Sequence, residues 1–240
     1  MTKQARQFLS FGALFLTVSL LFSALFRTAA EGIFSRSAGS VREPSGETVI
    51  ILDAGHGGED GGATGTNGVL EKDLNLQVTG DLTTLLRLAG YEVVQTRTED
   101  KLLYDAGTKK GHKKQGDLTN RLAVTRQYEN CIFISIHMNT FPDQRCEGTQ
   151  VWYSQNDPAS LELASAIQNS VKELLQPHNH RKVKAATSGI YLLRHAEVPA
   201  VLIECGFLST PAECERLCDP VYQKELTLAL FAAICEKVET

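Results

Sequence analysis

The sequence lacks the short motifs that most often assign a function directly. It has no CxxC pair, no HExxH motif and no internal repeat, so no familiar cysteine–histidine signature identifies a metal site. It also lacks an excess of positive charge. The formal net charge is −4, which argues against DNA or RNA as a partner. The 42% of hydrophobic residues and 22% of charged residues are typical of a globular protein with a sizeable core.

The six cysteines do not identify a site either. Cys131, Cys205 and Cys235 lie in apolar runs, where a free cysteine behaves as a small hydrophobic residue. Cys214 and Cys218 fall on one predicted helix with a spacing that suits a disulfide poorly. An even number of cysteines in an exported protein permits disulfides. Their pairing therefore stays open, and a structural role is the default expectation.

The first 30 residues have the character of a membrane or export segment. Residues 8–26 form an uncharged, mostly apolar run that follows Lys3 and Arg6, and about 20 apolar residues can span a bilayer. Residues 28–30 could form a cleavage site, so we expect either an uncleaved membrane anchor or a cleaved signal peptide over residues 1–30. The basic flank places the rest of the chain outside the cytoplasm.

The remaining chain predicts a linker and one domain. Residues 31–47 are rich in Ser, Gly, Arg and Glu, as in linkers. Over residues 48–240 strand-like and helix-like segments alternate, which predicts an α/β fold. We expect a mostly parallel or mixed six-stranded sheet with helices on both faces. Strands are expected at 48–53, 91–96, 131–136, 149–153, 190–193 and 200–203, and helices at 70–90, 118–128 (with Asp117 as N-cap), 158–175 and most of 211–240.

Ionisable side chains follow three of the predicted strands. His56 follows the first strand in a glycine-rich turn, His137 follows the strand at 131–136, and Glu204 follows the strand at 200–203. Glu71 opens the helix that comes after the glycine-rich turn. Ligands of open α/β sheets bind beyond the carboxyl ends of the strands. The four side chains are therefore expected in one crevice.

Two histidines and a carboxylate are the ligand set of many catalytic zinc sites. We therefore predict that His56, Glu71 and His137 bind one Zn²⁺ and that Glu204 acts as the base. Each residue has an ordinary alternative: a histidine after a strand is most often a hydrogen-bonded loop residue, and Glu71 could simply favour the helix dipole. Glu204 is harder to dismiss, because a carboxylate after an apolar run is costly to bury without a partner.

Four segments resemble the zinc-dependent N-acetylmuramoyl-L-alanine amidases of bacterial cell walls. They are DAGHGGEDGGA (53–63), LEKD (70–73), SIHMN (135–139) and IECGFLS (203–209), in the family's order. The resemblance implies a zinc exopeptidase/amidase-like fold over residues 48–240. It also implies hydrolysis of the amide between the lactyl group of N-acetylmuramic acid and the L-alanine of the stem peptide.

The resemblance also assigns roles to single residues. It implies zinc ligands at His56, Glu71 and His137 and a catalytic glutamate at Glu204. Arg97 and Arg121 fall where the family carries arginines, and together with Asn139 and His195 we predict them to contact substrate. The glycines around His56 are expected to thin the backbone so that a bulky polymer can approach the metal.

Within the family, the short chain without wall-binding repeats resembles the germination-specific amidases of spore formers. This resemblance implies a role in spore cortex maturation, through muramic δ-lactam formation, in the forespore intermembrane space. Peptidoglycan is the expected partner, together with the membrane through the N-terminal segment and an activating protein. The alternatives are a catalytically silent peptidoglycan-binding protein and a zinc peptidase of the same fold. The basic loop 109–114 is either solvated or contacts peptide carboxylates.

Overall fold

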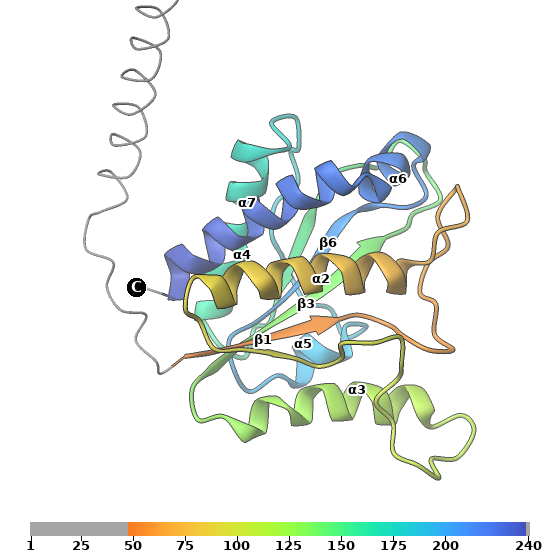
Figure 1. Cartoon of the computed structure of the whole chain (residues 1–240), viewed down its shortest axis with the longest axis vertical. Helices are drawn as coiled ribbons and strands as arrows, with labels where there is room; N and C mark the ends of the chain where they lie inside the picture. Colours follow the sequence, from red (N-terminus) through yellow and green to blue (C-terminus); the bar gives the residue numbers. More distant parts are fainter. Residues whose placement is uncertain (1–47, 239–240) are drawn as a thin grey trace, which may run out of the picture. The chain divides into compact units, whose positions relative to one another are not determined.

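The structure is a computed structural model that describes residues 48–238. The predicted anchor or signal peptide (1–30) and linker (31–47) lie outside the described residues. Within the described range, no helix is both long enough and apolar enough to span a bilayer. This part of the chain forms one six-stranded sheet with helices on both faces (Figure 1), which confirms the predicted α/β class.

The sheet is mixed, in the order β2-β1-β3-β6-β4-β5. The four strands β2, β1, β3 and β6 are parallel, whereas β4 runs antiparallel to β6 and parallel to β5. Because β1, β3 and β6 are adjacent and parallel, their carboxyl ends meet at one edge of the sheet. The strands are β1 (Val49–Ala54), β2 (Val93–Gln95), β3 (Cys131–Asn139), β4 (Gln150–Tyr153), β5 (Lys184–Ala185) and β6 (Ala200–Phe207).

Alternate residues of the central strands pack against two layers of helices. Ile50 and Leu52 of β1 join one apolar cluster, and Val49 and Ile51 join the other. Such strands are buried on both faces and are therefore apolar throughout. The first layer contains α2 (Glu71–Leu88), α4 (Ala159–Leu174), α6 (Pro211–Cys218) and α7 (Pro220–Val238), and the second contains α3 (Lys113–Ala123), the 3₁₀ helix η1 (Thr125–Gln127) and α5 (Tyr191–His195).

Two predicted elements differ from the structure. The sequence predicts a strand at 190–193, but this segment falls at the start of the short helix α5. The strand that brings the sheet to six is instead β5, which was not predicted. A short apolar run cannot distinguish a strand from a helical turn by periodicity alone. The second difference is Asp117, which does not cap a helix. Helix α3 begins four residues earlier, at Lys113, and Asp117 is buried within it.

All six cysteines lie in the described range and none forms a disulfide. Cys131, Cys205 and Cys214 are buried, and Cys205 and Cys214 belong to the apolar cluster on the α2 side of the sheet. The structure therefore agrees with the expected structural role of these three residues.

Candidate metal centre

The four predicted site residues converge at the carboxyl edge of the sheet. His56 lies two residues beyond the end of β1, and Glu71 is the first residue of α2. His137 and Glu204 are neighbours across the parallel pair β3–β6, where their Cα atoms are in register. The topology thus brings together residues that are far apart in the sequence.

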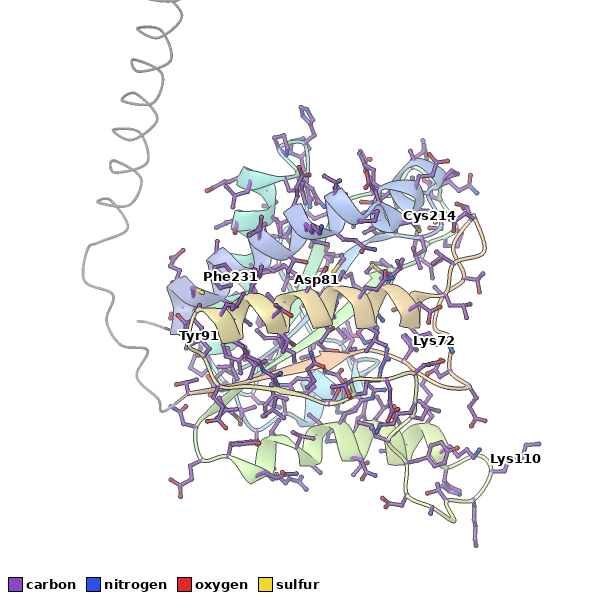
Figure 2. The ribbon with its side chains drawn as sticks, in the orientation of Figure 1. Lys72, Asp81, Tyr91, Lys110, Cys214 and Phe231 are labelled. Carbon is purple, nitrogen blue, oxygen red and sulfur yellow. The ribbon has the colours of Figure 1, made fainter. Side chains whose placement is uncertain are left out.

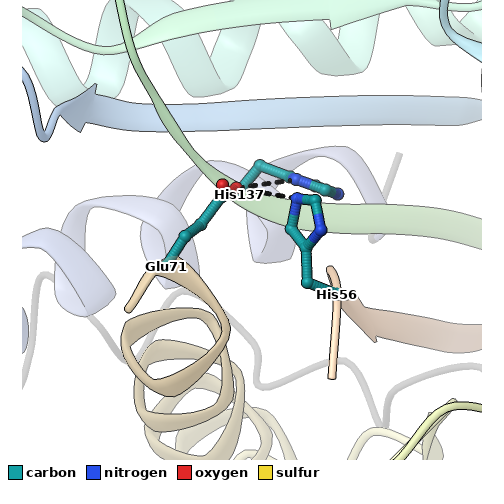
Figure 3. A group of neighbouring side chains, drawn as sticks. All are labelled: His56, Glu71 and His137. Atoms are coloured by element: carbon teal, nitrogen blue, oxygen red, sulfur yellow. Dashed lines mark hydrogen bonds and ion pairs between the residues drawn. The ribbon is translucent and has the colours of Figure 1, made fainter. Parts of the chain in front are cut away.

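Three of these side chains form a compact cluster (Figure 3). Glu71 Oε1 lies 3.0 Å from His137 Nδ1 and 3.3 Å from His56 Nε2. The two imidazole rings are edge-on, with centroids 4.9 Å apart and planes at 74°. One potential ligand atom from each residue lies within 4.8 Å of the other two. Two imidazole nitrogens and one carboxylate oxygen are thus gathered around one point.

Glu71 is held as a carboxylate. Its Oε2 accepts the backbone N–H of Ala63 at 2.7 Å, and its Oε1 accepts that of Met138 at 3.0 Å. Burial opposes ionisation, but the hydrogen bonds and charges of His137 and His56 outweigh it and hold the pKa of Glu71 well below its usual range. The side chain is therefore anionic and fixed in the orientation that faces both histidines.

Two glycines allow this packing. A Cβ at Gly55 would overlap the ring of His137, and a Cβ at Gly62 would lie 2.8 Å from His56 Cδ2 and 2.9 Å from Glu71 Cβ. Gly62 also has a positive φ of 66°, a conformation that favours glycine. Glycine is needed at these two positions to make room for the three clustered side chains. The reason expected from the sequence was a different one, namely room for a bulky polymer to approach.

His56 has the only positive φ, 61°, among the described residues other than glycine. A non-glycine residue there is strained by about 1–3 kcal/mol and persists only where its surroundings hold it. Arg121 supplies one restraint, because its Nη2 donates to the carbonyl oxygen of His56 at 2.7 Å and its Nη1 to that of Ala54 at 2.7 Å. Arg97 supplies another, through bonds to the carbonyl oxygens of Ala54 and Gly55 at 2.8 and 2.9 Å.

Both predicted arginines are buried beside the site, and Arg121 is among the residues that line its cavity. Arg97 is 2% exposed and Arg121 is 1% exposed. Arg121 makes five hydrogen bonds, to backbone carbonyls of β1 and its turn and to the carboxylates of Asp53 and Asp117. A guanidinium has five N–H donors, so all those of Arg121 have a partner within the protein. Donors of both arginines hold the turn that carries His56, and substrate contact by either arginine stays a prediction.

Asp53 supports the site through a buried ion pair, and the sequence did not single it out. It is fully buried, and its carboxylate accepts from Arg121 Nη1, Thr96 Oγ1 and Ser135 Oγ at 2.6–2.7 Å. Burial alone would raise the pKa of Asp53, but the charge of Arg121 and these hydrogen bonds lower it. A carboxylate at the end of an apolar β-strand was the signal that could have marked Asp53 as a buried charge in need of a partner.

Asp60 is a second residue beside the site that the sequence did not single out. Its Oδ1 lies 3.0 Å from His56 Nδ1, the ring nitrogen that faces away from Glu71. The two atoms are within contact distance but off the line of a good hydrogen bond. A carboxylate beside the outer nitrogen of a metal-binding histidine fixes its orientation and tautomer. The spacing of four residues within one glycine-rich turn was the available signal.

Glu204 lines a cavity of about 210 Å³ together with His56 and His137. Its Oε2 is buried and has no hydrogen-bond partner within the described part of the chain. Burial raises the pKa of Glu204 to about 7, although the charge of His137 opposes the shift. A carboxyl group in this environment can both take up and release a proton near neutral pH.

The other two predicted substrate contacts, Asn139 and His195, are not among the residues that line this cavity. Asn139, the last residue of β3, is half-buried and its Oδ1 accepts the N–H of Thr140. His195 is exposed, and its ring lies 4.3 Å from the ring of Tyr191, which lines the cavity. Substrate contact by Asn139 and His195 stays a prediction.

Comparison with known proteins gives consistent matches. Residues 50–236 match the N-acetylmuramoyl-L-alanine amidase family. The germination-specific N-acetylmuramoyl-L-alanine amidase of Bacillus subtilis is 36% identical over 192 residues, which cover 80% of each chain.

Two solved structures have the same fold. The CwlD amidase from Clostridioides difficile, solved in complex with the GerS lipoprotein, has a TM-score of 0.75 and 38% identity over 79% of this chain and 97% of that chain. The N-acetylmuramoyl-L-alanine amidase AmiC2 of Nostoc punctiforme has a TM-score of 0.70 and 25% identity over 82% and 99% of the two chains. The family match and the 36% identical relative show, in agreement with the sheet and the clustered side chains, that the chain belongs to the N-acetylmuramoyl-L-alanine amidase family.

Proposed function

We propose that the protein is a zinc-dependent amidase of peptidoglycan. It hydrolyses the amide between the lactyl group of N-acetylmuramic acid and the L-alanine of the stem peptide. The observation that carries this proposal is the convergence of His56, Glu71 and His137 beside Glu204 in one cavity. Membership of the amidase family supports the choice of bond.

The clustered donors fit a zinc ion. Two imidazoles and one carboxylate with an open fourth position are typical of catalytic zinc sites, and Glu71 is already ionised, as a ligand must be. His56, Glu71 and His137 would hold the ion. A bound zinc supplies Lewis acidity, which polarises a carbonyl and acidifies water.

The protein's own residues then handle the protons. Glu204 adjoins His137 across the sheet and has an unpartnered buried oxygen with which to accept a proton from the attacking water. The same carboxyl group returns the proton to the leaving nitrogen of L-alanine. Asp60 keeps His56 in the orientation that presents Nε2 to the cluster. Asn139 and His195 would contact the polymer.

The biological setting in this proposal is spore cortex maturation. A relative at 36% identity is a germination-specific amidase, and trimmed muramic acid is the precursor of the δ-lactam of the cortex. The substrate implies an extracytoplasmic location, here the forespore intermembrane space. Residues 1–30 would direct the chain there as a membrane anchor or signal peptide.

A partner protein is also part of the proposal. The related CwlD amidase was solved in complex with the GerS lipoprotein, which supports an activating partner for this chain. The open metal centre is compatible with assistance in zinc binding or in substrate delivery. Titration of a candidate lipoprotein into the zinc-loaded enzyme, with activity and binding measured together, tests this part.

The test of the amidase function is digestion of purified peptidoglycan by the zinc-loaded full chain. We expect new lactyl carboxyl groups on muramic acid and free L-alanine amino groups. A Glu204→Gln variant should retain zinc and lose cleavage by at least about 100-fold.

Cleavage of ordinary peptides but not of the muramoyl amide would indicate a zinc peptidase, and binding without cleavage would indicate a silent wall-binding protein. Comparison of cortex with vegetative wall tests the spore role.

A further inference from the structure

A second cavity adjoins the cavity of the candidate metal centre. The first cavity contains His56, His137 and Glu204. The second, of about 510 Å³, lies beside the loop that precedes α3. Asp60 and Lys114 line both cavities, so the two adjoin, and we call the second cavity with these two shared residues the groove.

The acidic groups of the second cavity already have partners. Glu59 Oε1 lies 3.0 Å from Lys113 Nζ, and the ammonium group of Lys113 also lies 4.8 Å from the centre of the Tyr104 ring. Asp60 Oδ1 lies 3.0 Å from His56 Nδ1. Lys113, Glu59 and Asp60 are therefore engaged within the protein.

Two lysines of the same cavity are not engaged in this way. The ammonium group of Lys114 lies 3.8 Å from Asp60 Oδ2, at the limit of an ion pair, and its side chain is 74% exposed. Lys110 has no ion pair with any described residue, and its side chain extends from the tip of the loop before α3 (Figure 2). The groove thus offers two flexible cationic side chains to a ligand.

We propose that this groove binds a carboxylate of the stem peptide, with Lys114 and Lys110 as its cationic partners. The inference rests on the proposed amidase function, because that function places the peptide beside the metal centre. Two extended residues span about 7 Å, so a carboxylate one or two residues beyond the scissile amide reaches past Asp60 to Lys114. Lysine suits this task, because its compact charge on a flexible stem follows a carboxylate of variable position. The glycan, rich in neutral hydroxyl groups, would then leave the metal centre on the side of α5.

The experiment compares two soluble muramoyl peptides that differ only at the second peptide residue. One carries a free carboxylate there and the other a carboxamide. With the zinc-loaded full chain, we expect kcat/KM to be about fivefold higher for the carboxylate, as suits an exposed ion pair, and the preference to shrink as salt rises. A Lys110→Gln/Lys114→Gln variant should lose the preference while its activity on the carboxamide is unchanged. Lys114→Glu should reverse the preference.

The matched control is Lys224→Gln, an exposed lysine on α7, against the opposite face of the sheet. It should keep the full preference. Loss of activity on both substrates to the same extent in the double variant, or an unchanged preference, would overturn the proposal.

A parallel binding titration of the two free stem peptides separates this inference from the amidase function. Preferential binding of the carboxylate, lost in the double variant, supports the groove even if no muramoyl amide is cleaved. Cleavage without any carboxylate preference in rate or affinity keeps the amidase function and rejects the groove.

Discussion

Arg121 Nη2 donates a hydrogen bond of 2.7 Å to the carbonyl oxygen of His56. The bond joins a buried cation in α3 to a residue whose φ of 61° lies in the left-handed region. Because backbone strain of this kind persists only where the surroundings fix it, the position of the His56 imidazole depends on a side chain that does not belong to the cluster of His56, Glu71 and His137. Arg121 is thus a positioning residue.

We predict that Arg121→Lys lowers the affinity for zinc by about 10- to 100-fold, as loss of supporting contacts around metal ligands does. Lysine retains the charge near Asp53 but cannot donate to the carbonyl oxygens of Ala54 and His56 together. Competition with a chelator measures the affinity. Arg126→Lys, at an exposed arginine of η1, is the control. A variant with lower thermal stability but unchanged zinc affinity would contradict the positioning role.

Gly62→Ala should disrupt the metal centre itself. Its Cβ would lie 2.5 Å from Glu71 Oε2 and 2.8 Å from His56 Cδ2, at a φ of 66°. Gly68→Ala is a close control, because Gly68 also has a positive φ, 88°, but has no atom within 4 Å of the added Cβ. An alanine at positive φ is strained by about 1–3 kcal/mol, so we expect both variants to lose stability. Only Gly62→Ala should also lose zinc binding, and equal zinc affinity in the two variants would show that the steric argument is wrong.

The buried Asp53–Arg121 pair should make stability depend on pH. Asp53→Asn removes one of the buried carboxylates that pair with the charge of Arg121. We expect the free energy of unfolding at pH 7 to fall by about 3–5 kcal/mol. The pKa of Asp53 is lowered in the folded protein. The unfolded chain therefore binds the proton first as pH falls, and the stabilisation is complete above the ordinary carboxyl pKa of about 3.9 and lost below it.

Urea denaturation at several pH values measures this effect. The difference between the wild type and Asp53→Asn should be constant above about pH 5 and shrink as pH falls below about 4. The exposed carboxylate Asp81 provides the control, since Asp81→Asn should change stability little at any pH. A difference that stays constant down to pH 2 would argue against the ion pair as its source.

The sequence was informative about those candidate site residues that could be located from their position at the end of a single strand. His56, His137 and Glu204 could be located because parallel strands bring their carboxyl ends to one edge. Helix α5 could not be distinguished from a strand, since Leu192 and Leu193 form a run too short to show a period. The sequence could indicate that Asp53 is a buried carboxylate, but it could not identify its partner: the ion pair spans 68 positions, and only the fold shows that Arg121 points at the backbone of the turn that carries His56.

Zinc should stabilise the fold as well as enable the reaction. A ligand that binds only the folded state adds about 2.7 kcal/mol at a concentration 100 times its Kd, which for a domain of this size corresponds to a rise in Tm of about 5–10 °C. We expect this rise in the wild type, and its abolition by a chelator or by His137→Ala, which removes one of the three clustered donors. His195→Ala should retain the rise, because His195 is exposed and lies outside the cluster. Thermal unfolding followed by circular dichroism measures the shift without any assay of activity. If His137→Ala kept the full zinc-dependent rise, the ion would be bound elsewhere and the assignment of the metal centre would be wrong.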